Sequence, residues 1–165
     1  MSKTAIFYGS TTGNTESAAH KIKDLLGDAD IFSIGSASVD DMMKYDNLIL
    51  GSSTWGYGDL QDDWEMVIKQ LSDVDFSSKK VAFFGTGDQD AYSDTFVDAI
   101  GILYEALGHS KAKFIGEWPI EGYDYTESKA EKDGKFLGLA LDDDTQAELT
   151  EERIKNWVAK LKANL

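Results

Sequence analysis

Apolar residues along this chain fall into two alternating patterns. Short, nearly continuous apolar runs predict buried strands at residues 4–8, 29–34, 47–52, 81–86 and, as the start of a fifth strand, 113–116. Between these runs, apolar residues recur three and four positions apart, which predicts helices over residues 14–26, 38–44, 64–71, 96–107 and 150–161. This alternation of strand and helix favours an α/β fold with a parallel sheet covered by helices on both faces.

The region 117–135 breaks the alternation. It is polar and aromatic without a clean period, and residues 136–141 then read as strand again, so the simplest interpretation is an insertion within or beside the fifth strand. No repeat, low-complexity tract or linker divides the chain, and we expect residues 1–165 to form a single domain. In the last helix, Thr150 is the expected N-cap, with two glutamates in the first turn.

Charge and composition narrow the classes of function. Acidic residues outnumber basic ones by 30 to 16, which gives a net charge of −14. Such a surface repels nucleic acid and anionic membranes and attracts basic partners, although solubility alone is an alternative reason for it. No apolar run approaches the ~20 residues of a membrane span, and the first residues lead directly into a strand without room for a signal peptide. Cysteine is absent, which excludes disulfides, thiolate metal sites and thiol catalysis. We therefore expect a cytoplasmic protein without nucleic-acid binding or membrane insertion.

The first candidate binding loop, GSTTGNT, follows the first strand and opens the first helix. Doubly wound sheets bind ligands at the carboxyl ends of their strands, where backbone N–H groups and a helix N-terminus can hold a phosphate. The loop has no lysine and matches neither the Walker spacing nor G-x-G-x-x-G, which favours a single terminal phosphate held by neutral donors. The alternative is a hydroxyl-rich helix cap, although a cap needs only one such residue. The candidate residues are Ser10, Thr11, Thr12, Gly13, Asn14 and Thr15.

Aromatic residues stand in two further loops, after the third and fourth strands. The stretch STWGYGD places Trp55 and Tyr57 among glycines, and TGDQDAY places Tyr92 behind Gly87. Each aromatic residue taken alone is more often a packing residue than a ligand contact. Two of them at one sheet edge can hold a flat ring between them, so we predict that Trp55 and Tyr92 contact opposite faces of such a ring.

In this order and spacing, GSTTGNT, STWGYGD and TGDQDAY resemble the three FMN-binding loops of flavodoxins, and residues 117–135 resemble the insertion in the fifth strand of long-chain flavodoxins. The resemblance covers essentially the whole chain. It implies a doubly wound five-stranded parallel sheet in the order 2-1-3-4-5 and one noncovalent FMN with its phosphate in the first loop. The further cofactor-binding residues that it implies are Ser52, Ser53, Thr54, Trp55, Gly56, Tyr57 and Gly58, then Thr86, Gly87, Asp88, Gln89, Tyr92 and Asp94, and finally Asp144.

The resemblance also implies a function. The chain would be a low-potential electron carrier whose FMN passes between quinone, semiquinone and hydroquinone, with the Gly56 carbonyl accepting the N5 proton. Aspartates around the site would disfavour the anionic hydroquinone, because like charges repel. The expected partners are basic-faced redox proteins such as a ferredoxin–NADP reductase, served by a monomer. The insertion lies outside the three loops, so we expect it to serve docking or folding and to be dispensable for flavin binding.

Two other functions are compatible with a doubly wound α/β fold. An FMN-dependent NAD(P)H:quinone reductase can share this topology but needs a pocket for a second substrate. A phosphoacceptor signalling module would need acids at the end of the first strand, where this chain has Phe7, Tyr8 and Gly9. His20 and His109 are expected at the surface, and no group of residues has catalytic or metal-binding spacing. We therefore expect neither enzyme activity nor a metal site.

Overall fold

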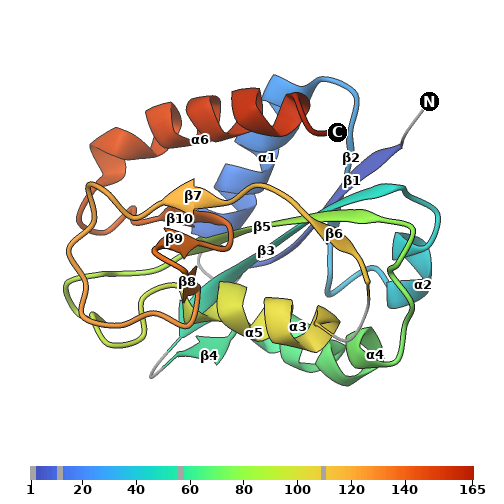
Figure 1. The fold of residues 1–165 in the computed structure, drawn as a ribbon, viewed down its shortest axis with the longest axis horizontal. Coiled ribbons are helices and arrows are strands. Elements are labelled where there is room, and N and C mark those ends of the chain that lie inside the picture. Colours follow the sequence, from blue (N-terminus) through green and yellow to red (C-terminus); the bar gives the residue numbers. More distant parts are fainter. Residues whose placement is uncertain (1–2, 11–12, 56–57, 109–110) are drawn as a thin grey trace.

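A twisted parallel sheet forms the centre of the protein. The computed structural model describes residues 3–10, 13–55, 58–108 and 111–165 (Figure 1). The main path of the sheet runs β10-β5-β3-β1-β2, and all neighbours on it are parallel. These strands are β1 (Thr4–Gly9), β2 (Asp30–Ser33), β3 (Asn47–Trp55), β5 (Lys80–Thr86) and β10 (Leu139–Leu141). With the predicted strands counted along the chain, the order is 2-1-3-4-5, which confirms the predicted doubly wound fold.

The fifth predicted strand is divided into two pieces. The first piece, β6 (Lys113–Phe114), pairs with the start of β5, and β10 pairs with the end of β5. Between them the chain leaves the sheet and forms a small antiparallel sheet in the order β7-β9-β8 (Figure 1). Its strands are β7 (Trp118–Pro119), β8 (Glu131–Lys132) and β9 (Lys135–Phe136). The polar, aromatic region is therefore an insertion within the fifth strand, as predicted.

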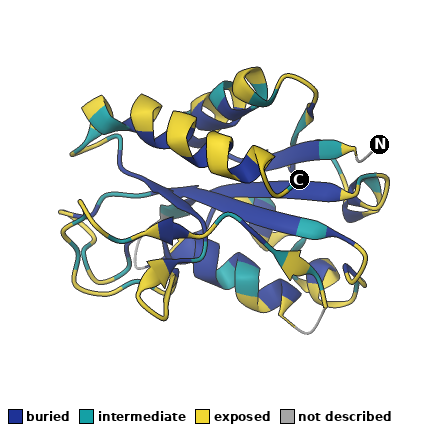
Figure 2. Cartoon of the chain, turned by 45° about the horizontal axis from the view of Figure 1, so that its top comes forward, coloured by how far each residue is buried: buried dark blue, intermediate teal, exposed yellow. Residues whose placement is uncertain are grey.

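Helices cover both faces of the sheet. The long helices α1 (Asn14–Leu26) and α6 (Ala147–Lys162) lie on one face, while α3 (Asp62–Glu65), α4 (Ile68–Ser72) and α5 (Asp98–Leu107) lie on the other, and α2 (Val39–Met42) is a single short turn (Figure 1). The strands are buried between them, and the helices expose their outer surfaces (Figure 2). The predicted apolar face of α6 is buried against the sheet, at Ile154, Trp157, Val158 and Leu161. Within the described ranges, no helix is long and apolar enough to cross a membrane.

Two local predictions were wrong. The helix predicted over residues 64–71 is interrupted, because Val67 N–H bonds to Trp64 O three residues back and starts a tighter turn between α3 and α4. Trp64 is fully buried, and its indole N–H donates to Gly51 O at 2.7 Å, which fixes the first short helix against the sheet. Thr150 is not an N-cap either. It lies one turn inside α6, and its hydroxyl donates to Asp143 Oδ1.

Candidate functional site

The sheet register brings the ends of four parallel strands to one edge. Gly9 of β1 pairs with Ser52 of β3, Ser53 pairs with Thr86 of β5, and Leu141 of β10 pairs with Thr86 from the other side. The chain leaves the sheet at this edge in each of the three predicted loops and in the loop after β10. The candidate residues from four distant segments are therefore brought together, as the doubly wound topology requires.

The first loop is a helix N-terminus with an open approach. Gly13 has a φ of 98°, in the left-handed region that favours glycine, and α1 begins at the next residue, Asn14. Ser10 Oγ accepts a hydrogen bond from Gly13 N–H at 3.1 Å and so holds the turn closed. A Cβ on Gly13 would meet no atom of the described residues within 4 Å, which leaves that side of the turn accessible. Thr11 and Thr12 lie outside the described residues.

Tyr8 and Glu16 fasten the base of this loop. The Tyr8 hydroxyl, near the end of β1, donates to Glu16 Oε2 in the first turn of α1 at 2.8 Å. Burial, followed by this hydrogen bond and the charge of Glu16, raises the pKa of Tyr8 to about 12. The phenol therefore stays protonated and keeps donating at neutral pH, so the strand and the helix on either side of the loop remain joined.

Thr15 joins the first loop to the third. Its side chain is buried in the first turn of α1, and its Oγ1 lies 2.9 Å from Oγ1 of Thr86 at the end of β5. Because β3 separates β1 from β5 in the sheet, this hydrogen bond spans the strand that carries the second loop. One hydroxyl proton serves the pair, and the other hydroxyl can still donate to a ligand. Both threonines were predicted as ligand contacts, and the structure adds a bracing role.

The second loop is a short hairpin between β3 and β4 (Asp59–Leu60). Thr54 pairs with Leu60 and Trp55 with Asp59, and Gly58 turns the chain with a φ of 94°. The predicted residues Gly56 and Tyr57, and the side chain of Trp55, lie outside what the structure describes.

Two predicted ligand hydroxyls of this loop bond within the protein. Buried Ser52 Oγ donates to Ser53 O at 2.8 Å and accepts Gln61 N–H at 3.3 Å. Thr54 Oγ1 accepts Ala99 N–H at 3.1 Å, which ties β3 to α5. The hydroxyls of Ser52 and Thr54 therefore hold the loop in place from the protein side.

The third loop presents an aromatic ring. Asp88 Oδ1 accepts the N–H groups of Asp90 and Ala91 at 3.0 and 2.9 Å, which closes a turn just before Tyr92. The Tyr92 side chain is 47% exposed, unusual for a large ring and suited to covering a flat ligand. Asp94, the last predicted residue of this segment, is exposed as well.

Gln89 is turned away from this face. Its side chain is buried, donates to Thr145 Oγ1 at 3.3 Å and accepts Asp124 N–H from the insertion. Its amide therefore anchors the third loop to the insertion and to the loop after β10. A ligand contact from Gln89 would have to come from its backbone.

Asp142 is a site-building residue that sequence reasoning did not assign. It is fully buried at the end of β10, where it accepts the N–H groups of Gln89, Asp144 and Thr145 at 3.1, 3.1 and 2.9 Å. The carboxylate thereby locks the third loop to the loop after the fifth strand. The sequence shows only that Asp142 directly follows a buried apolar run. It is the first of three consecutive aspartates, residues 142–144, and nothing in the sequence distinguishes it from the other two.

Negative charge collects at this edge. Asp144 is exposed, yet burial and then the carboxylates of Asp88, Asp142 and Asp143 raise its pKa above the usual range. The segments 9–15, 52–61 and 86–92 contain no lysine or arginine. Among the described residues, no cluster of histidine, aspartate and glutamate is arranged to hold a metal ion. The edge therefore combines neutral phosphate donors with an acidic surround.

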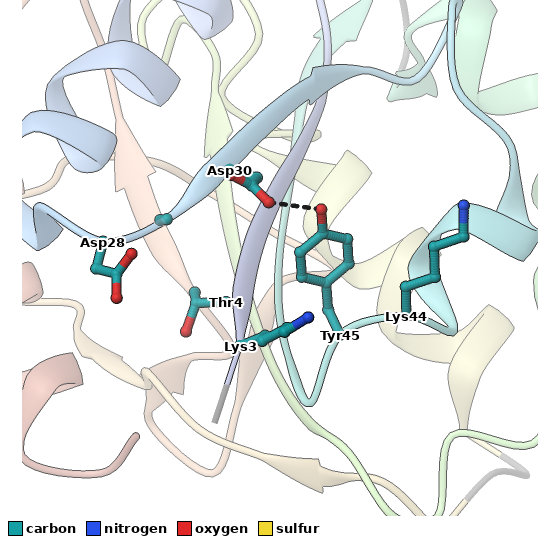
Figure 3. A pocket seen from close by; sticks show the side chains of 7 residues that line it. Lys3, Thr4, Asp28, Asp30, Lys44 and Tyr45 are labelled. Atoms are coloured by element: carbon teal, nitrogen blue, oxygen red, sulfur yellow. Dashed lines mark hydrogen bonds between the residues drawn. The ribbon is translucent and has the colours of Figure 1, made fainter. Parts of the chain in front are cut away.

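A hollow of about 410 Å³ lies at the opposite edge of the sheet. Figure 3 shows its lining, Lys3, Thr4, Asp28, Ala29, Asp30, Lys44 and Tyr45. The Tyr45 hydroxyl donates to Asp30 Oδ2 at 2.6 Å, drawn there as a dashed line. Thr4 and Asp30 begin β1 and β2, so this hollow lies at the amino ends of the strands and contains none of the predicted site residues.

Comparison with known proteins gives one consistent result. The family model described as Flavodoxin matches residues 6–157. The chain is 52% identical over 165 residues to the flavodoxin of Synechocystis sp., covering 98% of this chain and 97% of that protein. It is 43% identical over 168 residues to flavodoxin 1 of Escherichia coli, covering 100% and 96%. Among solved structures, Fusobacterium nucleatum flavodoxin bound to flavin mononucleotide matches with a TM-score of 0.95 at 32% identity, covering 100% of this chain and 99% of that one.

Proposed function

The chain belongs to the flavodoxin family, and on that premise we propose that it is an electron carrier that works with one noncovalently bound FMN. It moves electrons between redox partner proteins and has no substrate site of its own. The observation that carries the proposal is the meeting, at one sheet edge, of an open phosphate-type turn at Gly13 with the exposed ring of Tyr92. The residues fit a flat ligand with a single phosphate.

When bound, FMN supplies a ring system that accepts and releases electrons one at a time. The turn at residues 10–15 holds the phosphate with backbone N–H groups, hydroxyls and the N-terminus of α1. Tyr92 covers one face of the ring, and Trp55 is the predicted contact on the other. Nearby carboxylates such as those of Asp88 and Asp144 make added negative charge on the ring unfavourable, which keeps the potential low.

Reconstitution with FMN followed by anaerobic photoreduction tests this function. The apoprotein should bind one FMN per chain, take up two electrons in separate steps and pass them to an added one-electron acceptor. Acid precipitation should release FMN. Recovery of FAD, or failure of the folded protein to bind any flavin, would overturn the proposal. Steady-state oxidation of NADPH by the purified protein alone would instead identify a reductase.

The proposal also includes the partner of the carrier, its oligomeric state and its location in the cell. A net charge of −14, with aspartates at the flavin edge, favours a basic partner such as a ferredoxin–NADP reductase and a monomer in the cytoplasm. The rate of electron transfer with such a reductase should fall steeply as salt rises, because exposed charges are screened beyond ~8 Å at physiological ionic strength. A rate that does not depend on salt would contradict electrostatic attraction of a basic partner. Sedimentation of the holoprotein tests whether it is a monomer, and fractionation of the cells tests whether it is cytoplasmic.

A further inference from the structure

Part of the insertion lies along the third loop and the start of α5. We call this segment, residues 124–130, the strap. Its hydrogen bonds run from Asp124 N–H to Gln89 Oε1, from Thr126 N–H and Glu127 N–H to Ser93 O, and from Ser128 Oγ to Phe96 O. The insertion is therefore bonded repeatedly to a segment that builds the flavin edge, which its place in the sequence did not reveal.

The strap packs closely against helix α5 at Gly101. A Cβ at this position would clash with the backbone carbonyl of Lys129, so glycine lets the two backbones approach. Glycine inside a helix costs ~1 kcal/mol relative to alanine, and close packing of the strap is the compensation. Ala130, the next residue of the strap, is fully buried.

Asp98 lies between the strap and the second flavin loop. It is the first residue of α5 and is only 2% exposed. Its Oδ1 accepts Lys129 N–H from the strap at 2.8 Å. Its Oδ2 faces Gly58 so closely that a Cβ on Gly58 would lie 2.6 Å from it. One carboxylate is thus hydrogen-bonded to the insertion and packed next to Gly58 of the hairpin between β3 and β4.

The residue before Asp98 is held in a strained backbone conformation. The preceding residue, Val97, is fully buried with a φ of 48°, a left-handed conformation that β-branched residues rarely adopt. Such strain persists only where neighbouring contacts fix the backbone. Burial raises the pKa of Asp98, and the hydrogen bond from Lys129 N–H acts in the opposite direction. The charged form of this carboxylate is therefore stabilised by the strap.

We propose that Asp98 is a positioning residue through which the strap holds residues 58–60, the described return strand of the β3–β4 hairpin, in place. The support of the hairpin by Asp98 is a property of the protein without flavin. Its effect on flavin binding rests on the proposed function, because the predicted flavin-binding residues 56 and 57 belong to the same loop. The insertion would then support the flavin site, in contrast to the expectation from the sequence that it is dispensable for flavin binding.

Three substitutions and one control test this role. Asp98→Ala removes the contact with both neighbours, and Asp98→Asn keeps the size and the acceptor for Lys129 N–H. Gly101→Ala displaces the strap without altering Asp98 or any predicted flavin contact. Gly134→Ala is the control: its φ of 80° strains an alanine there, but the methyl group meets no atom of the described residues within 4 Å, so this variant shows what local strain in the insertion does without a clash against the strap. The readouts are amide hydrogen exchange at residues 58–60 in the apoprotein, the Kd for FMN and the first one-electron potential.

Exchange at residues 58–60 should accelerate, by about threefold or more, in Asp98→Ala and Gly101→Ala, because the hairpin loses the packing of the Asp98 side chain against Gly58. The first potential should shift in both, while Asp98→Asn and Gly134→Ala stay within about threefold in exchange and keep the potential. Unchanged exchange in folded Asp98→Ala or Gly101→Ala would overturn the proposal, and so would an Asp98→Asn potential shifted as far as that of Asp98→Ala. Absence of FMN binding in the unmodified protein would overturn the proposed function alone, because the exchange experiment needs no flavin.

Discussion

The hydroxyls of Thr15, in the first turn of α1, and Thr86, at the end of β5, meet at 2.9 Å. Both side chains are buried, so each hydroxyl depends on the other for a hydrogen bond. The contact fixes the distance between the phosphate turn and the aromatic loop before any ligand arrives. Preorganisation of this kind lowers the entropy cost of binding.

Removing either hydroxyl should weaken both stability and FMN binding. Thr86→Val leaves Thr15 with a buried unpaired hydroxyl, at a cost of ~1–3 kcal/mol in the free energy of unfolding. The double substitution Thr15→Val and Thr86→Val should cost less than the sum, since two apolar groups of the same shape replace the pair. Chemical denaturation of the apoproteins and FMN titration measure both effects. Thr126→Val, at an exposed bond of 3.4 Å, is the control and should change stability by less than ~0.5 kcal/mol. Additive losses in the double variant would exclude coupling between the two hydroxyls.

Substitutions at the two glycines that flank α1 can distinguish the effect of backbone strain from the loss of a ligand contact. Gly13 before α1 and Gly27 after it both have positive φ, and a Cβ on either would meet no atom of the described residues within 4 Å. Gly13→Ala and Gly27→Ala should each lower the free energy of unfolding by ~1–2 kcal/mol, because left-handed backbone penalises a Cβ. Only Gly13→Ala should weaken FMN binding, since only Gly13 lies at the phosphate turn. Equal Kd values for FMN in the two variants would place the phosphate elsewhere.

Tyr92 should govern the fluorescence of the bound flavin. Tyr92→Ala removes a side chain that is 47% exposed, so stability should change little. FMN affinity should fall about two- to tenfold, because ring stacking contributes ~0.5–1.5 kcal/mol beyond burial. Flavin fluorescence at saturation should rise as quenching is lost. Met66→Ala, which removes another exposed apolar side chain at 81% exposure, should leave both unchanged. Unaltered fluorescence in saturated Tyr92→Ala would argue against ring contact.

The fold, and the convergence of the three loops at one sheet edge, could be predicted because their signals are local. A buried strand followed by glycines and hydroxyls marks a turn at a sheet edge wherever that strand lies, and the parallel topology brings such edges together. The same reasoning failed for the helix at residues 64–71. Its apolar spacing was correct, yet the hydrogen bond of the Trp64 indole to Gly51 and the turn at Val67 depend on the finished sheet.

The supporting acids could not be predicted for a related reason. Asp98 and Asp142 look like the exposed acids beside them, and only tertiary contacts distinguish them. Asp142 receives N–H groups from two loops, and Asp98 receives one from an insertion about 30 residues away in the sequence. A residue whose partners are distant backbone groups leaves no spacing signal of its own.

Two aspartates with opposite pKa shifts give a pH test of the acidic edge. Burial and neighbouring carboxylates raise the pKa of Asp144, so its charge destabilises the fold above that pKa, and the penalty disappears as pH falls through it. Asp41 has its pKa lowered, first by a hydrogen bond from Ser38 N–H, so its charge stabilises the fold above the usual carboxyl range of ~4 and that stability is lost on acidification.

At neutral pH, Asp144→Asn should therefore raise the free energy of unfolding of the apoprotein, by at most ~0.5 kcal/mol for so solvated a carboxyl. Asp41→Asn should lower it. Both differences should shrink as pH falls below 4, because the wild-type carboxyls are then neutral as well. Added salt should reduce the Asp144 effect, since part of it is repulsion by Asp88, Asp142 and Asp143. Urea denaturation of both variants and the wild type at several pH values and two salt concentrations measures these differences. A stabilisation by Asp144→Asn that persisted unchanged at acid pH would have a cause other than charge. The carboxylates at this edge would then not repel one another measurably, and there would be no reason to expect them to disfavour negative charge on the flavin.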